Sequence, residues 1–332
     1  MNYRILGKTG FKISEVSLGT WQVGGKWGDA FNDKNAEQIL GTALDAGINF
    51  IDTADVYSDG LSEKAVGKIV NSRRKSGKEE IFVATKCGRK INPHRAAEYK
   101  PEVLKGFVEA SLKNMGLETL DLIQLHCPPT EVYYRPEIFE LFDKLKEQGK
   151  IRNLGVSVEK VEEAIKAINY PNVTTVQIIF NMFRTRPAEL FFELARKQNI
   201  GIIVRVPLAS GLLSGKITPD TRFSEGDHRQ FNRNGEAFDR GETFSGVDLS
   251  TGFAAVEELQ KLCPAGTSLA AWAIKWVLMF REVSCVIPGA SRPEQVTENS
   301  KASSLQDIPD EVMQKIAKIY DTRIKPLVHH YW

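Results

Sequence analysis

A repeated alternation of short apolar segments with helical patterns most constrains the fold of this chain. The helical segment 34–46, for example, stops at Gly47 and is followed by a strand pattern at 48–51. Strands that alternate with helices at this spacing predict βαβ units and a parallel sheet. Eight units in one chain favour a closed (β/α)8 TIM barrel over an open doubly wound sheet. The expected strands are 16–19, 48–51, 80–85, 120–125, 153–156, 174–179, 201–206 and 283–287.

Three features extend beyond the eight units. Residues 4–6 and 11–13 flank a turn that contains two glycines, which predicts an N-terminal β-hairpin. A polar loop over 217–251 follows the seventh strand, and its length favours a functional lid over a spacer. An extra C-terminal helix is expected over 310–323. We expect a single domain over 1–332, because barrels of this size fold as one unit and no linker interrupts the pattern.

The composition is that of an ordinary globular protein, with 42% hydrophobic and 26% charged residues. The formal net charge of +2 is too small to indicate nucleic acid or a membrane surface as a partner. The N-terminus lacks the apolar region of a signal peptide, and the apolar stretch 269–280 is too short to span a bilayer. We therefore expect a cytoplasmic protein with a small-molecule partner, and a monomer is compatible with the sequence.

The four cysteines, Cys87, Cys127, Cys263 and Cys285, have neither CxxC spacing nor the pattern of a disulfide framework. Reduced thiols in a cytoplasmic protein are the simplest account. Cys87 and Cys127 could join His126 in a metal site, but the chain contains no paired ligand motif. We expect no metal.

Four polar residues are expected where successive strands end. Asp52 follows the second strand and Tyr57 lies in the loop after it, while Lys86 and His126 follow the third and fourth strands. Singly, each has an ordinary interpretation, such as a helix cap, a solvated rim residue or a structural histidine. In a barrel, however, the C-terminal ends of the strands converge on one mouth, so these four side chains are expected to meet.

Together these residues form an acid site suited to a carbonyl group. A tyrosine has an ordinary pKa of about 10, and a neighbouring ammonium such as that of Lys86 would lower it. Asp52 can hold Lys86 in place, and His126 can hydrogen-bond and orient a carbonyl oxygen. The set contains neither a nucleophile nor a metal, so a cofactor must supply the hydride that reduces a carbonyl to an alcohol.

At these residues the chain resembles the aldo-keto reductases. Asp52-Thr53-Ala54 with Tyr57, Ala84-Thr85-Lys86 and Leu125-His126 are similar to the catalytic tetrad of that family. The resemblance covers nearly the whole chain and includes four further segments, 18–20, 149–157, 207–216 and 287–292.

The resemblance implies NADPH bound across the barrel mouth with the nicotinamide near Tyr57. Ser157 and Gln177 match positions that hold the carboxamide, and the backbone of 208–213 would hold the pyrophosphate. Arg292, Gln295 and Asn299 match positions at the adenosine end, and their spacing also places them on one helical face. The complete set of expected cofactor contacts is Gly19, Thr20, Trp21, Asp52, Ser157, Gln177, Arg205, Pro207, Leu208, Ser210, Gly211, Leu213, Lys216, Ile287, Gly289, Ser291, Arg292, Gln295 and Asn299.

Two positions depart from the family pattern. Val158 follows Ser157 where the family often has asparagine, which removes one amide contact to nicotinamide. Arg205 stands where the family usually has an aromatic residue that packs on the nicotinamide. A guanidinium can also stack on a ring, but its charge would disfavour the oxidised, cationic cofactor. We expect Arg205 to bias the site toward reduction, or else to be a structural ion-pair partner.

The choice of NADPH over NADH is expected to depend on the start of the last barrel helix. Ser291 and Arg292 lie where backbone N–H groups and the helix dipole favour an anion, and a guanidinium adds charge-assisted bonds to a 2′-phosphate. Glu294 is interpreted as the capping partner at the third helical position. No acidic residue directly follows the turn at 288–290 to favour a free 2′-hydroxyl.

The leading interpretation is an NADPH-dependent reductase of aldehydes or ketones. A cofactor-binding regulatory subunit resembling the β-subunits of potassium channels is an alternative, because such proteins can keep the tetrad. A barrel isomerase or aldolase that uses Lys86 as a Schiff base is a third. The substrate pocket is expected to involve the loops 21–27, 89–99, 128–134 and 217–251 and the tail, with Trp21, Trp27 and Tyr133 as aromatic walls.

Overall fold

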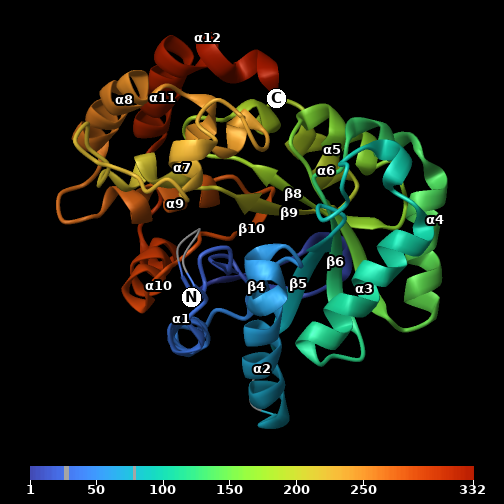
Figure 1. The fold of residues 1–332 in the computed structure, drawn as a ribbon. Helices are drawn as coiled ribbons and strands as arrows, with labels where there is room; N and C mark the ends of the chain where they lie inside the picture. Colours follow the sequence, from blue (N-terminus) through green and yellow to red (C-terminus); the bar gives the residue numbers. More distant parts are fainter. Residues whose placement is uncertain (26–29, 78–79) are drawn as a thin grey trace.

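The computed structural model describes residues 1–25, 30–77 and 80–332. Trp27, expected in a loop at the barrel mouth, lies outside the described residues. Helices surround a central sheet of parallel strands (Figure 1). The strands of this sheet are β3 (Leu18–Gly19), β4 (Phe50–Asp52), β5 (Phe82–Cys87), β6 (Leu120–His126), β7 (Ile151–Ser157), β8 (Val173–Ile179), β9 (Gly201–Arg205) and β10 (Val283–Val286).

The sheet closes on itself, which confirms the predicted (β/α)8 barrel. Each strand from β3 to β10 pairs in parallel with the next along the chain. Parallel bridges from Val16 to Val286 and from Gly19 to Gly289 then join the first strand to the last. Since every strand runs in the same direction, the residues that end them lie at one rim of the barrel.

The outer layer is made of helices that each follow a strand. In α3, Pro101 occupies the first turn, where its missing N–H costs little, and Gly116 ends the helix in the left-handed conformation. Leu104, Val108 and Met115 form its buried face. The outer helices are α1 (Asp33–Asp45), α2 (Leu61–Lys75), α3 (Pro101–Met115), α4 (Pro136–Glu147), α5 (Val161–Ala167), α6 (Phe191–Lys197), α9 (Leu269–Leu278) and α10 (Pro293–Ser300).

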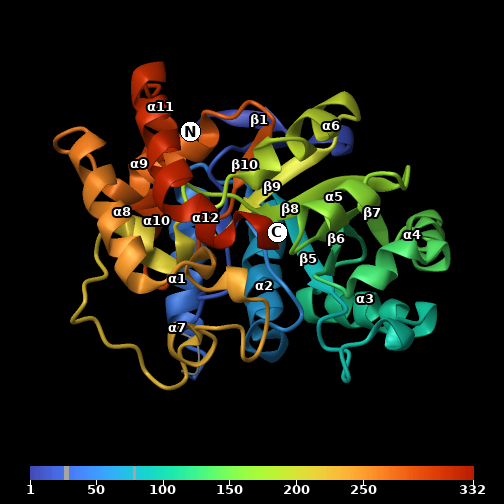
Figure 2. The ribbon, with the colours of Figure 1, turned by 90° about the horizontal axis from the view of Figure 1, so that it is seen from above.

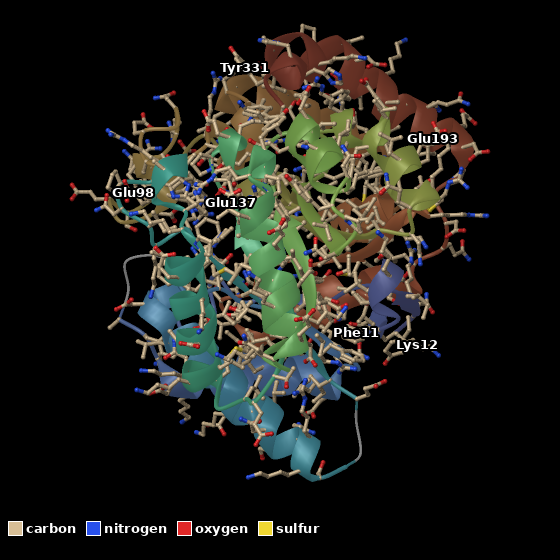
Figure 3. The ribbon with its side chains drawn as sticks, turned by 90° about the vertical axis from the view of Figure 1, so that its right-hand side faces the viewer. Phe11, Lys12, Glu98, Glu137, Glu193 and Tyr331 are labelled. Carbon is tan, nitrogen blue, oxygen red and sulfur yellow. The ribbon has the colours of Figure 1, made fainter. Side chains whose placement is uncertain are left out.

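The predicted N-terminal hairpin, β1 (Tyr3–Ile5) with β2 (Lys12–Ser14), closes one end of the barrel. Phe11 stacks on Phe82 with ring centroids 4.1 Å apart, inside a buried cluster drawn from the hairpin and the strand interiors. Gly7 has φ +48 and lies so close to β9 that an added Cβ would be 2.1 Å from the backbone nitrogen of Gly201. In Figure 3, Phe11 and Lys12 lie on the opposite side of the molecule from Glu98, which is in the loop after β5. The opposite end of the barrel is therefore left for a site.

Two predicted segments differ from expectation in detail. The segment expected as a loop over 217–251 contains α7 (His228–Phe231) and two single turns, Arg240–Glu242 and Phe244–Gly246, and its last residues already belong to α8 (Leu249–Leu262). The expected C-terminal helix is α11 (Asp310–Ile319), which continues through a π-helical turn, Tyr320–Ile324, into α12 (Lys325–Val328). Figures 1 and 2 show α11 beside α8. Among the described residues, no helix combines the length and hydrophobicity needed to cross a bilayer.

Candidate active site

A cavity of about 810 Å³ lies at the rim formed by the C-terminal ends of the strands. Its walls come from the strand ends, from the loop after β9 and from the start of α10. Most of the residues predicted from the sequence line it. They are Gly19, Thr20, Trp21, Asp52, Tyr57, His126, Gln177, Arg205, Pro207, Leu208, Ser210, Gly211, Lys216, Ile287, Gly289, Ser291, Arg292, Gln295 and Asn299.

Lys86 connects two of the four predicted polar residues. It lies in β5 with its side chain 1% exposed, and its ammonium donates to Asp52 Oδ1 and to the backbone oxygen of Thr53 at 2.8 Å. The same Nζ atom is 3.4 Å from the hydroxyl oxygen of Tyr57. Lys86 does not line the cavity itself. Its ammonium therefore acts on a bound ligand by way of the Tyr57 hydroxyl, which lies between them.

Asp52, the last residue of β4, is held on its second oxygen by two glutamines. Gln124 Nε2 donates to Asp52 Oδ2 at 2.9 Å, and Gln177 Nε2 donates to the same oxygen at 2.8 Å. Gln177 also donates to Gln124 Oε1 at 3.1 Å. The amide nitrogen of Gln177 is thus used within the protein, and its amide oxygen is the atom that could meet a carboxamide. Gln124 was not predicted, because an inward-facing polar residue in mid-strand leaves no local signal.

Burial and charge act against each other on the Tyr57–Lys86 pair. Burial raises the pKa of Tyr57 above its ordinary value, outweighing the lowering by the Lys86 ammonium that the sequence led us to expect. Burial alone would lower the pKa of Lys86, but the charges of Asp52 and Tyr57 and the hydrogen bonds to both raise it instead. At neutral pH the tyrosine is therefore a protonated phenol beside a charged ammonium.

His126, the last residue of β6, faces Tyr57 with ring centroids 6.0 Å apart and the ring planes nearly perpendicular. Burial, followed by the positive charges of Arg89, Lys86 and Arg205, holds its pKa well below the usual range. The imidazole is therefore neutral and can donate one N–H. Its Nδ1 atom is buried and has no hydrogen-bond partner among the described residues. A neutral donor beside a phenol is suited to binding the oxygen of a carbonyl group.

The other end of the cavity combines the N-terminus of α10 with two cationic side chains and with Glu294 and Glu298. Arg292 is the exposed N-cap residue of α10, and within the described part of the chain it makes no ion pair. Lys216 also lines the cavity and likewise has no ion-pair partner among the described residues. A helix N-terminus with two available cations fits the phosphates of a dinucleotide.

The prediction that Glu294 is the capping partner of this helix is wrong. Gln295, not Glu294, is the third helical residue, and its Oε1 accepts from the backbone nitrogen of Ser291 at 2.7 Å and from the Ser291 hydroxyl at 3.1 Å. The helix begins one residue later than the capping-box pattern implied, since Pro293 occupies its first position. Gln295 is therefore a structural partner of Ser291 as well as a residue of the cavity wall.

Two expected cofactor contacts lie behind the cavity wall. Ser157 ends β7 with its hydroxyl 3.6 Å from Cys127 Sγ, and Leu213 is completely buried. Neither lines the cavity, and both remain predictions as cofactor contacts. Tyr133, expected as an aromatic wall, is instead wrong in that role, because it is fully buried in the core and its hydroxyl lies 3.5 Å from the Ser157 carbonyl oxygen.

Arg205 both lines the cavity and forms an ion pair. Its Nη1 atom is 3.3 Å from Glu242 Oε1, and its Nη2 atom donates to the Val158 carbonyl at 3.1 Å. Arg205 is therefore an ion-pair partner that also lines the cavity, and its expected bias of the site toward reduction stays a prediction.

Several cavity residues were not individually predicted, and four of them carry polar or aromatic side chains that matter below. Arg89 comes from the loop after β5, and His228, Phe238 and Glu242 come from the long loop after β9. The His228 ring lies 4.8 Å from that of Trp21, and the Arg89 guanidinium lies 5.5 Å from the centre of the Phe238 ring. The only sequence signal for them was the length of their loops, which had been expected to form the pocket.

A model of one protein family matches most of the chain. The model is described as "Aldo/keto reductase family" and matches residues 15–321. A relative named "Uncharacterized oxidoreductase YqkF", from Bacillus subtilis, is 30% identical over 95% of this chain and 95% of its own length. The "NADH-specific methylglyoxal reductase" of Escherichia coli is 29% identical over 94% of this chain and 97% of its own. A "probable voltage-gated potassium channel subunit beta" of Arabidopsis thaliana is 28% identical over 98% of both chains.

Solved structures of two related enzymes are similar to this chain over almost its whole length. The glycerol dehydrogenase AKR11B4 from Gluconobacter oxydans superimposes with a TM-score of 0.77 and 29% identity, over 97% of this chain and 96% of that one. The holo form of aldo-keto reductase AKR11C1 from Bacillus halodurans has a TM-score of 0.77 and 26% identity, over 96% of both chains.

Proposed function

Because this chain belongs to the aldo/keto reductase family, we propose that it reduces an aldehyde or ketone to the alcohol, with NADPH as the hydride donor. The observation that carries the proposal is the Tyr57 hydroxyl, 3.4 Å from the Lys86 ammonium and open to a cavity that also contains His126. A phenol backed by a buried cation is a proton donor whose product, the phenolate, is stabilised in place.

Each side chain has a distinct task in this scheme. The bound dinucleotide supplies the hydride. Tyr57 donates its hydroxyl proton to the carbonyl oxygen, which becomes strongly basic as the carbonyl is reduced. Lys86, fixed by Asp52, stabilises the phenolate that remains, and the neutral His126 donates a hydrogen bond that orients the carbonyl. Gln124 and Gln177 hold Asp52, so they position the charge pair.

NADPH is proposed over NADH because of Arg292. Arg292 occupies the N-cap position of α10, where its exposed side chain makes neither a capping hydrogen bond nor an ion pair to any described residue. A bond from a guanidinium to a phosphate contributes about 1.5–3 kcal/mol, or roughly 10- to 150-fold in affinity. The NADH-specific name of one relative indicates that cofactor choice varies among similar proteins, so this chain's own residues must decide it.

Arg292→Ala tests that choice. We expect NADPH affinity to fall at least about tenfold while NADH affinity changes little, since only NADPH carries the 2′-phosphate. The dissociation constants of both cofactors are measured by quenching of tryptophan fluorescence, at low and high salt. Arg323→Ala, which removes a surface arginine paired with Glu258, is the matched control. Equal losses for both cofactors would mean that Arg292 supports the helix or the adenine and does not select the phosphate.

A cofactor-binding subunit is the second candidate, because a relative that spans 98% of this chain is named a potassium channel subunit beta. An assay of carbonyl turnover distinguishes the reductase from the cofactor-binding subunit. NADPH oxidation at enzyme-like rates with a panel of aldehydes and ketones supports the reductase. Tight NADPH binding with no turnover of any carbonyl would favour the binding subunit.

A Schiff-base enzyme is disfavoured by the state of Lys86. Schiff-base chemistry needs a neutral, accessible amine. The Lys86 amine is 1% exposed, bonded to Asp52 and Thr53, and its pKa is raised by the charges of Asp52 and Tyr57 despite the opposing effect of burial.

A further inference from the structure

Two arginines converge on one carboxylate beside the carbonyl site. Arg89 Nη1 and Arg205 Nη1 each lie 3.3 Å from Glu242 Oε1, and all three residues line the cavity. Arg89 and Arg205 also lower the pKa of His126, after burial itself, which places both charges near the ring that would orient the carbonyl. We call the cluster of Arg89, Arg205 and Glu242 the cationic corner. It lies at the substrate end of the cavity.

This corner has more hydrogen-bond donors than its protein partners use. Each guanidinium carries five N–H groups, and both arginines reach Glu242 through the same single oxygen. Arg205 also donates to the Val158 carbonyl, but its Nε atom is buried and has no hydrogen-bond partner among the described residues. A buried donor without a partner is costly, so a ligand that accepts from it gains binding energy.

The charges of the corner do not cancel. Two guanidinium groups face one Glu242 carboxylate, while Asp52 and Lys86 neutralise each other nearby. The next carboxylate, Glu159, lies 3.9 Å from Arg89. Burial, followed by the charges of Glu242 and Asp239, raises the pKa of Glu159, which weakens Glu159 as a counter-charge. The only carboxylate oxygen of the corner within 3.5 Å of the two guanidiniums, among the described residues, is therefore the Glu242 Oε1 that they share.

A metal ion is a poor occupant of this corner. Ligand atoms of Cys127, Glu159 and Glu242 lie within 4.8 Å of one another, a spacing that a cation could bridge. However, Arg205 Nη2 is 3.5 Å from Cys127 Sγ, and both guanidiniums already contact Glu242. Positive charges therefore stand where a metal would bind, and the arrangement favours an anion.

We propose that Arg89 and Arg205 bind a carboxylate of the substrate, so that the preferred substrates are short carbonyl compounds with a carboxylate next to the carbonyl, the 2-oxo acids. A planar carboxylate matches the guanidinium geometry and can accept from both arginines. The assignment of the carbonyl as the reacting group rests on the proposed function. The anion site itself rests on the geometry of the corner.

A 2-oxo acid and its methyl ester, which lacks the negative charge and adds one methyl group, test this inference. Phenylglyoxylate is a 2-oxo acid, and methyl phenylglyoxylate is its neutral ester. Binding of both to the NADPH complex of Tyr57→Phe is measured calorimetrically, so that turnover does not interfere. We expect the acid to bind at least about tenfold tighter than the ester, as one charge-assisted bond would give.

Two further substitutions in the same Tyr57→Phe background should act in opposite directions. Arg89→Met should weaken binding of the acid about tenfold and that of the ester less than about twofold. Glu242→Gln removes the competing negative charge and should tighten binding of the acid. Arg73→Met, which removes a surface arginine paired with Asp45, is the control and should change neither.

Equal binding of acid and ester, or equal losses of both in Arg89→Met, would overturn the inference. Weaker binding of the acid in Glu242→Gln would also overturn it. If the wild type turns over the ester and shows no preference for the acid, the anion site is rejected and the reductase proposal stands. If the acid binds selectively but no carbonyl is turned over, the anion site stands and the reductase proposal is rejected.

Discussion

At the residue scale, two aspartates three positions apart have opposite surroundings. Asp52 is bonded to Lys86, Gln124 and Gln177. Asp55 is 4% exposed, and neither of its carboxylate oxygens has a hydrogen-bond partner among the described residues. Burial, with a smaller contribution from the charge of Glu63, raises the pKa of Asp55 from 3.8 to about 7. An ionised Asp55 is therefore a local source of instability.

Asp55→Asn should stabilise the protein at high pH. The folded state keeps a proton on Asp55 between pH 3.8 and about 7 that the unfolded chain releases, so the wild type loses stability as pH rises through this range. A pKa shift of this size changes the free energy of unfolding by at most roughly 4 kcal/mol. The variant lacks this ionisation, so its advantage in urea unfolding should be larger at pH 8 than at pH 4.5. An equal difference at both pH values would mean that Asp55 is not the titrating group.

The candidate tetrad could be predicted at this scale because Asp52, Lys86 and His126 lie at the ends of strands and Tyr57 lies in the loop that follows Asp52. Gln124, Arg89 and Glu242 could not. Gln124 is recognisable only through its bond to Asp52, and Glu242 only through arginines that are 37 or more positions away in the chain. Such contacts are set by the folded geometry and leave no periodic pattern in the sequence.

At the element scale, the loop between β9 and α8 is fixed by bonds to distant segments. Asn181 Nδ2 donates to Ser245 Oγ at 2.9 Å, and Trp332 Nε1 donates to Asp239 Oδ2 at 3.0 Å. The Arg184 guanidinium lies 4.3 Å from the centre of the Trp332 ring. The sequence predicted a long loop over 217–251, but not its short turns or the start of α8 at Leu249. Partners far along the chain hold these turns in place.

Trp332→Ala should therefore loosen this loop without unfolding the barrel. The substitution removes both the indole bond to Asp239 and the ring under Arg184, so local opening should become easier. Limited proteolysis with trypsin should cleave after Arg222 or Arg233 several-fold faster than in the wild type, at an unchanged far-UV circular dichroism spectrum. His330→Ala, at an exposed neighbouring position, is the control. An unchanged cleavage rate would show that the other contacts hold the loop alone.

At the scale of the whole molecule, the two ends of the barrel have separate roles. The hairpin end is closed by Phe11, Phe82 and the buried cluster around them, and the opposite end carries the cavity. The eight βαβ units and the hairpin were predictable from local patterns. The closure of the barrel bottom by the hairpin was not, because an amphipathic hairpin could pack on many surfaces.

Phe11→Ala should lower stability and leave the cavity intact. Truncation of a buried phenylalanine typically costs about 3–5 kcal/mol, and Phe11 is 5% exposed. The urea midpoint should fall accordingly. The dissociation constant of NADPH should stay within about twofold, because the ends of the barrel strands, and not the hairpin, hold the cavity residues in place. A large loss of NADPH affinity in a protein of unchanged stability would show that the two ends are coupled.

The central claim is that Tyr57 protonates a carbonyl at this rim, and Tyr57→Phe tests it most directly. The substitution removes the proton donor and keeps the ring that faces Trp21 and His126. With a carbonyl substrate that the wild type reduces, kcat should fall by about 10²–10⁴-fold, while the dissociation constant of NADPH changes less than about twofold. A variant that retains more than about a tenth of the wild-type kcat would contradict the account, because a general acid of this kind contributes far more than that.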